Sequence, residues 1–325
     1  MTTRKTLFNV LHVALFVVAM STSLWAQWPD YPTRGVPKKD GKPDLTAPTP
    51  RTADGKVDFT GLWEAGRGGG GGGRGAAGGG RGGAGGAGGA APAGAAPAGG
   101  APAGGAPAPA GPSNAPRADA PPPVQASPDG TPPLATFFEI GANIKGGPPY
   151  TPWAKELRDG RAKANAKDNP DAHCLPIGLM QLHLHPQPRK IVQTQDVMII
   201  MYEAQAEVRQ VFLDGRPLPK NDPQPWWRGY SVGRWEGDTL VVETVGFRDD
   251  VWLDVNGSPL TETGKMTERF RRPNFGTVEI DITIEDPKSY TKPFTVRVNQ
   301  RALLDTDLIE FVCNEGETSS KYYDK

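Results

Sequence analysis

Hydrophobic and polar residues alternate along much of the chain after residue 178, and this period of two predicts β-strands. The clearest case is residues 278–284, whose apolar positions are Val278, Ile280, Ile282 and Ile284. Residues 294–299 repeat the pattern, and residues 180–185 alternate strictly as well. The run 197–202 is continuously apolar, as expected of a strand buried on both faces.

Together these segments predict a mainly β fold. Further strands are expected at 61–64, 208–213, 229–235, 239–247, 266–272 and 308–312. Strands that follow one another every 8–12 residues or so indicate an antiparallel meander, here of about eight to ten strands. A lipocalin-like barrel is favoured over a sandwich because closure removes the sheet edges. One helix is predicted over 151–166, with Thr151 as its cap and Pro152 at its first position.

Composition divides the chain into four parts. Residues 1–26 resemble a secretory signal, with a basic start, an apolar stretch and a small residue before the expected cleavage point. An arm follows at 27–65, then a Gly/Ala/Pro linker at 66–133 that is expected to be disordered, and a β domain at 134–325. We therefore expect an exported protein, periplasmic or extracellular, that is not transmembrane after cleavage. An uncleaved N-terminal anchor is the alternative.

Charge and cysteine usage narrow the function classes. The chain has 36 basic and 36 acidic residues, so nothing in its charge favours a nucleic-acid partner. Its two cysteines, Cys174 and Cys313, predict a disulfide in an oxidising compartment. A metal-binding pair or a catalytic thiol is the alternative. No cofactor is predicted, and the oligomeric state is left open.

Several motifs carry a family resemblance: Cys174-Leu175-Pro176, 191–194, 209–216, 229–244, 267–270 and 283–287. Through them the chain resembles an uncharacterised family of exported proteins from environmental bacteria, Acidobacteria among them. The resemblance covers about 138–317 together with 58–63, and it implies export but no particular activity. Separately, Gly61-Leu62-Trp63 is similar to the Gly-x-Trp motif that opens lipocalin barrels. The linker separates this triplet from the other strands, unlike in lipocalins.

His183 and His185 form a candidate metal site. On a strand, residues i and i+2 share a face about 7 Å apart, which suits two imidazole ligands of zinc or copper. His173 is a candidate third ligand. The alternative is a polar, solvent-facing side of an edge strand, since Pro186 and Pro188 follow at once. Many members of the similar family lack this histidine pair.

Ligand binding has its own candidates: Glu243, Arg234, Glu268, Tyr230 and Trp235. Alternation groups Glu243 with Val241 and Glu268 with Phe270, so both acids lie in the barrel if those faces point inward. A desolvated carboxyl group has a raised pKa and can act as a general acid or base. The alternative is a buried Glu–Arg pair that sets strand register.

Three functions follow from these features. The first is a β-barrel that binds a small apolar or aromatic molecule. The second is a hydrolase or isomerase that uses inward carboxylates or the His-x-His metal site. The third is a structural protein associated with the cell envelope.

Overall fold

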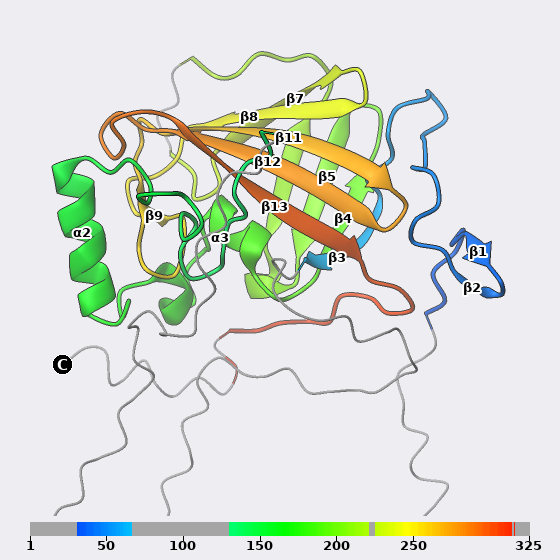
Figure 1. Cartoon of the computed structure of the whole chain (residues 1–325), viewed down its shortest axis with the longest axis horizontal. Helices are drawn as coiled ribbons and strands as arrows, with labels where there is room; N and C mark the ends of the chain where they lie inside the picture. The colour runs from blue at the N-terminus through cyan, green and yellow to red at the C-terminus, as the bar shows by residue number, and fades with distance from the viewer. Residues whose placement is uncertain (1–30, 67–129, 221–224, 314, 316–325) are drawn as a thin grey trace, which may run out of the picture.

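The predicted barrel is confirmed. A computed structural model describes residues 31–66, 130–220, 225–313 and 315, and within them nine strands close into a barrel (Figure 1). The predicted signal and nearly all of the predicted linker lie outside the described residues. In the order of their neighbours, the strands are β11 (Lys265–Asn274), β12 (Thr277–Glu285), β13 (Phe294–Ala302), β3 (Gly61–Ala65), β4 (Arg189–Gln193), β5 (Val197–Tyr202), β6 (Val208–Phe212), β7 (Tyr230–Glu236) and β8 (Thr239–Val245).

One pairing departs from the predicted antiparallel meander. β6 and β7 run parallel and share only two register pairs, Val211 with Ser231 and Phe212 with Val232. The other barrel neighbours are antiparallel. A parallel pair needs a connection that brings the chain back to the starting end of the first strand, and 213–229 is that connection.

The arm supplies a strand that completes the sheet, and the strand predicted at 61–64 is present as β3. β3 pairs with β13 on one side and with β4 on the other. Beside it, the buried Phe59 ring stacks on Trp235 at 6.0 Å between ring centres. Trp63 donates its indole hydrogen to the carbonyl of Phe59 at 3.0 Å. The arm therefore covers the end of the barrel at which β7 turns into β8.

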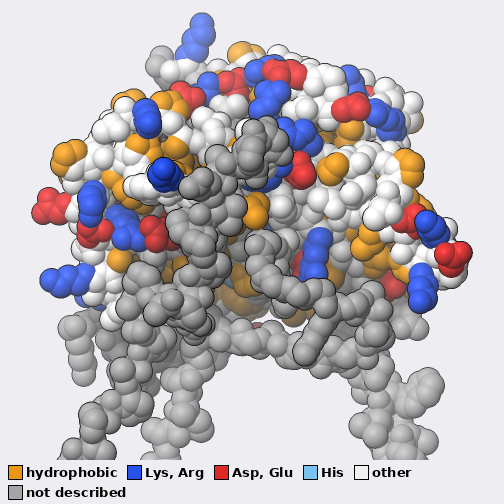
Figure 2. All heavy atoms as spheres, in the orientation of Figure 1, with side chains coloured by type: hydrophobic (Ala, Val, Ile, Leu, Met, Phe, Trp, Pro, Cys, Tyr) orange, Lys and Arg blue, Asp and Glu red, His pale blue; other side chains and the backbone are white. Residues whose placement is uncertain are grey.

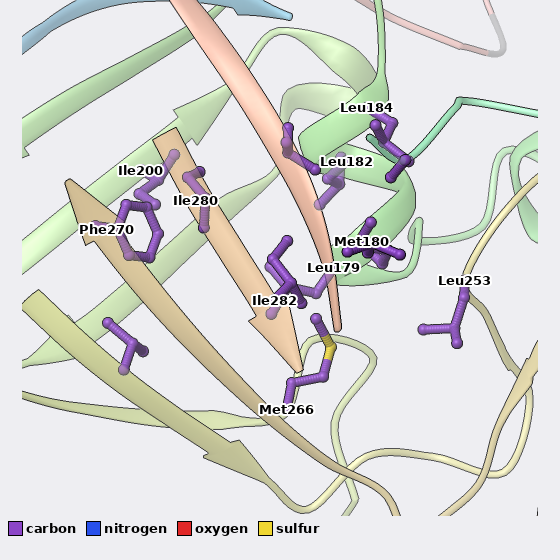
Figure 3. Close-up of a cluster of buried hydrophobic side chains, with 14 of the residues drawn as sticks. Leu179, Met180, Leu182, Leu184, Ile200, Leu253, Met266, Phe270, Ile280 and Ile282 are labelled. Carbon is purple, nitrogen blue, oxygen red and sulfur yellow. The ribbon is translucent and has the colours of Figure 1, made fainter. Parts of the chain in front are cut away.

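A short helix closes the other end. The strand predicted at 180–185 is wrong, because Leu179–Leu184 form a helix, α3, and all six of its residues are buried. Its apolar side chains belong to the same buried cluster as strand residues such as Phe270 and Ile282 (Figure 3). The polar residues Gln181 and His183 are buried like the apolar ones between which they fall, so this helix of fewer than two turns has the alternation of a strand.

The remaining elements lie outside the barrel. The predicted helix is present as α2 (Pro152–Lys163), with Thr151 accepting a hydrogen bond from the Ala154 amide at 3.2 Å. It ends three residues before the predicted Ala166. The small elements are β1 (Lys38–Lys39), β2 (Lys42–Pro43), η2 (Pro170–His173), η3 (Ala204–Ala206), β9 (Val251–Trp252) and β10 (Pro259–Leu260).

The last predicted strand, 308–312, is wrong, but the disulfide beyond it is confirmed. Ile309 and Val312 are 52% and 50% exposed and pair with no strand of the described chain. Cys313 is bonded to Cys174, across 139 residues of sequence. The bond anchors this irregular C-terminal segment to the end of η2.

Removing the disulfide is expected to destabilise the protein without changing its fold. Closing a loop of 139 residues lowers the entropy of the unfolded chain, which corresponds to about 4–5 kcal/mol. The Cys174→Ser/Cys313→Ser variant should lose about this much free energy of unfolding in urea titrations. A variant as stable as the oxidised wild type would contradict the expectation, and the reduced wild type is the matched control.

Candidate functional site

A groove of about 420 Å³ lies where β6 and β7 separate. Its walls come from residues 208–212 and 225–231. The two strands pair only at Val211 and Phe212, so the earlier residues of β6 have no neighbour on that side within the ladder. The groove thus lies between the two neighbouring barrel strands that share the fewest paired residues.

Stacked aromatic rings form one wall of the groove. Phe212 stacks on Tyr230 at 5.2 Å, and Tyr230 packs against Trp226 at 5.5 Å. The guanidinium of Arg216 covers the Phe212 ring at 3.9 Å. At the other end Trp226 remains 40% exposed. The stack therefore ends in a large aromatic surface that is open to a ligand.

The backbone holds Trp226 in place. Its amide donates to the Gly246 carbonyl at 2.9 Å, and its carbonyl accepts from the Arg248 amide at 3.0 Å. At Gly229, φ is +65°, and a Cβ there would lie 2.8 Å from the Val245 carbonyl oxygen. Only glycine fits this close approach, which starts β7 beside β8. The groove is thus built on a fixed backbone.

The charges at the groove are compensated. Arg228 lines the groove and forms an ion pair with the nearly buried Glu207. Burial raises the pKa of Glu207, while the charge of Arg228 opposes this rise. Arg216 is paired with Asp214 in the same way. With its arginines neutralised, the groove favours an uncharged ligand with an apolar face.

Inside the barrel, beneath the groove, lies a belt of polar side chains supplied by α3 and by seven strands. We call this set the polar belt: His183, Arg189, Tyr202, Arg209, Ser231, Thr244, Glu268 and Gln300. Arg209 is at its centre, donating to Glu268 Oε1 at 3.0 Å and to Thr244 Oγ1 at 3.0 Å. It also bonds the Ser231 hydroxyl at 3.1 Å. These bonds join β6, β7, β8 and β11 from within.

Glu268 is ionised although it is fully buried. Burial would raise its pKa, but the charge of Arg209 and a hydrogen bond from His183 outweigh burial and lower the pKa to about 2. Since a carboxylate only accepts hydrogen bonds, His183 Nε2 donates to Glu268 Oε1, at 2.8 Å. Burial lowers the pKa of His183, and Arg209 and Arg189 reinforce the effect, so the imidazole is neutral.

Arg189 anchors the C-terminal end of α3. It donates to the carbonyl oxygens of His183 at 2.8 Å, His185 at 2.6 Å and Gln187 at 2.7 Å. Carbonyl groups at a helix C-terminus have no partner within the helix and carry partial negative charge. Burial lowers the pKa of Arg189 to about 10, and the cation is held by these oxygens and by Gln300 rather than by a carboxylate.

The five predicted ligand-binding residues do not form one site. Glu268 and Trp235 are at inward positions, whereas Glu243 is not, because the inward set of β8 is Leu240, Val242 and Thr244. Arg234 and Glu243 lie on the outer face, bonded to each other at 2.7 Å. Tyr230 lines the groove and Trp235 packs against Phe59.

The two predicted metal ligands point to different partners. His183 bonds Glu268 in the barrel, whereas His185, just after α3, lies 3.7 Å from Asp171. The shared face expected of a strand is absent because the segment is helical. Across the ranges given above, no three His, Cys, Asp or Glu side chains converge as a metal ion would require.

Arg209, Trp226 and Trp227 were missed as site residues. Arg209 falls at an inward position of β6, on the same face as the buried Val211, and an arginine at a buried position of an apolar strand was the available signal. The two tryptophans lie just before β7, where the sequence has no strand pattern. Their adjacency was the signal, and it did not distinguish a ligand wall from the core.

Comparison of the chain with protein-family models, with curated proteins and with solved structures finds no match. Among the described helices, none has the length and apolarity needed to cross a membrane.

Substituting Glu268 should destabilise the barrel strongly. Glu268→Gln leaves the Arg209 guanidinium buried without a counter-charge, which costs about 3–5 kcal/mol of unfolding free energy. The double variant Arg209→Met/Glu268→Leu removes both charges and should recover most of that loss. Glu243→Gln, at the surface pair, is the control and should cost at most about 1 kcal/mol. Urea titrations measure all three, and equal losses for the Glu268→Gln and Glu243→Gln variants would refute the argument.

Acidification should destabilise the fold in two stages. Folded His183 stays neutral, so below its ordinary pKa of 6.5 the unfolded chain binds a proton that the folded chain excludes. Glu268, with a folded pKa of about 2 against an ordinary 4.5, adds a second loss between these values. The urea concentration at half unfolding should therefore decrease as the pH is lowered from about 7 to about 5. It should decrease again as the pH approaches about 3.

The first stage should disappear in His183→Gln and persist in His173→Gln, the control for losing a histidine. A wild-type midpoint that stays constant between about pH 7 and pH 5 would show that His183 is not excluded from protonation.

Proposed function

We propose that the protein binds a small, uncharged apolar or aromatic molecule in the groove between β6 and β7, and that it does so after export. The observation that carries this proposal is the stack of Phe212, Tyr230 and Trp226, which ends in an exposed ring. The volume of about 420 Å³ is within the range of small-molecule sites. The ligand lies outside the barrel wall.

Two features favour the groove over the barrel interior. The interior next to α3 is occupied by packed side chains, including Leu182, Met266 and Phe270 (Figure 3). The polar belt satisfies its own charges within the barrel, so an inward ligand would have to displace formed hydrogen bonds. Export is supported by the disulfide, since such bonds persist in oxidising compartments.

Binding of Nile red, an uncharged planar aromatic dye, tests the proposal. The wild-type chain should bind the dye saturably at one site, and Trp226→Ala should weaken binding about five- to tenfold, because one stacked ring contributes about 1 kcal/mol. Trp153→Ala is the matched control, since Trp153 is similarly exposed, at 44% against 40%, but lies on α2.

Dye fluorescence titrations and melting curves should be recorded for each variant. Trp226→Ala also loses the contact with Tyr230, so its melting curve must show that the variant is still folded at the temperature of the titration. Equal dye affinity in the Trp226→Ala and Trp153→Ala variants would rule out the groove as the binding site.

A further inference from the structure

The barrel presents two unlike outer faces. Most outward positions of β4, β5 and β6 are apolar, and we call these six the outer apolar face: Val192, Val197, Ile199, Met201, Val208 and Phe212. The two polar outward positions are Lys190, opposite Met201, and Gln210, opposite Ile199. The six apolar residues are cross-strand neighbours, Val192 with Ile199, Met201 with Val208 and Val197 with Phe212. Val192 and Val208 are 37% and 48% exposed. The last two members of the face also border the groove.

The opposite side of the barrel is covered by ion pairs. Outward acids and bases of β7, β8, β11, β12 and β13 bond one another, as in Arg234–Glu243, Lys265–Glu243, Arg269–Glu236, Arg271–Asp281 and Arg297–Asp281. Basic and acidic side chains are intermingled on the face seen in Figure 2. A contiguous apolar surface beside such a charged one marks a binding surface.

We propose that residues 82–116 of the same chain cover the outer apolar face. This segment contains seven prolines and no charged residue, and alanine and glycine make up nearly all the rest. Packing it against valine, isoleucine and methionine would therefore bury no charge of the segment itself, and the one cation among the outward positions of these strands, Lys190, is already paired with Asp307. Proline-rich segments also pack their rings against aromatic side chains, which Phe212 and Trp226 offer at the edge of the face.

The attachment points of the segment allow it to reach this face. The chain leaves the barrel after Gly66, whose amide bonds the Asn299 carbonyl, and rejoins it at Pro133, whose carbonyl accepts from the Arg297 amide. Both points lie on β13, and β4 to β6 lie two to four strands away. With strands about 4.8 Å apart, that is about 10–20 Å around the barrel wall.

The connecting lengths exceed this distance. The 16 residues from Gly66 to Gly82 can span up to about 53 Å, and the 14 from Pro116 to Gly130 up to about 46 Å. Because the segment is tethered at both ends, its concentration at the face is effectively millimolar, and weak contacts suffice to hold it there.

Photo-crosslinking of the full chain tests this docking. The photoreactive residue p-benzoylphenylalanine is placed at Val208, with Thr283, an outward position of β12 on the charged side, as the control. After irradiation, trypsin cuts after Arg81 and Arg117 and so releases the segment within one peptide, 82–117. Monomer-sized product in which this peptide is joined to 191–209 is the expected result. The yield should be clearly higher from Val208 than from Thr283, because the tether brings the segment near both positions and only docking holds it at Val208.

The same label at Val192 guards against a local effect at Val208, and it should crosslink to 82–117 as well. Crosslinks between two molecules would show that a second copy covers the face, and would overturn the proposal. Equal yields from Val208 and Thr283, or none from both Val208 and Val192, would overturn it too. Phe212 and Trp226 belong to the groove as well, so a docked segment would compete with a ligand for these rings. The crosslinking readout involves no dye, so a failure of the docking is distinguishable from a failure of ligand binding.

Discussion

The buried ion pair between Glu268 and Arg209 is the constraint on which the rest of the barrel depends. A buried charge that loses its partner or its hydrogen bonds is strongly destabilising, so the relative positions of these two side chains are fixed. Arg209 also bonds Ser231 and Thr244, and so connects β6 to β7 and β8 from the inside. On the wall itself β6 and β7 share two register pairs only. The interior hydrogen bonds therefore hold β6 and β7 together. The outer side of this strand pair can then form a groove while the barrel stays closed.

The same ion pair positions α3, the helix that closes one end of the barrel. His183 donates to Glu268 from α3, and Arg189 holds the carbonyl groups at the end of that helix. A helix of six residues has little stability of its own, because most of its backbone groups lack a partner within it. Its place in the barrel is thus set by tertiary contacts, polar at one end and apolar along the sides. The polar belt connects α3 to the strands of the barrel. This structural role explains the buried titratable groups without invoking catalysis.

How far the sequence predicts this structure depends on whether the signal is local. The alternation of Val278 to Ile284 reports directly on one face of β12, and the disulfide follows from two cysteines, so both were predicted. The alternation at 180–185 was misleading, because a helix enclosed by a barrel has no polar face to reveal its period. The parallel β6–β7 pair leaves no local signature, since it depends on the path of 213–229. Glu268 was predicted to be inward, but its partner Arg209 lies 59 residues away, and only the closure of the barrel brings them together.

The path of the chain also makes the barrel independent of the composition of the long Gly/Ala/Pro stretch. β3 is contributed from before the long Gly/Ala/Pro stretch, yet it completes the sheet between β13 and β4. After the stretch, Leu134 forms a β-bridge with Arg297 on β13, the same strand with which β3 pairs. Since the stretch departs and returns at one strand, the barrel requires of it only that its ends meet there, and a short loop would meet that requirement. A tract of 35 uncharged residues, 82–116, exceeds it greatly. Closing a longer loop costs little more free energy than closing a short one, so such an insertion is tolerated whatever its use. The barrel therefore does not require the lack of charge in this tract, and the proposed docking on the outer apolar face accounts for it.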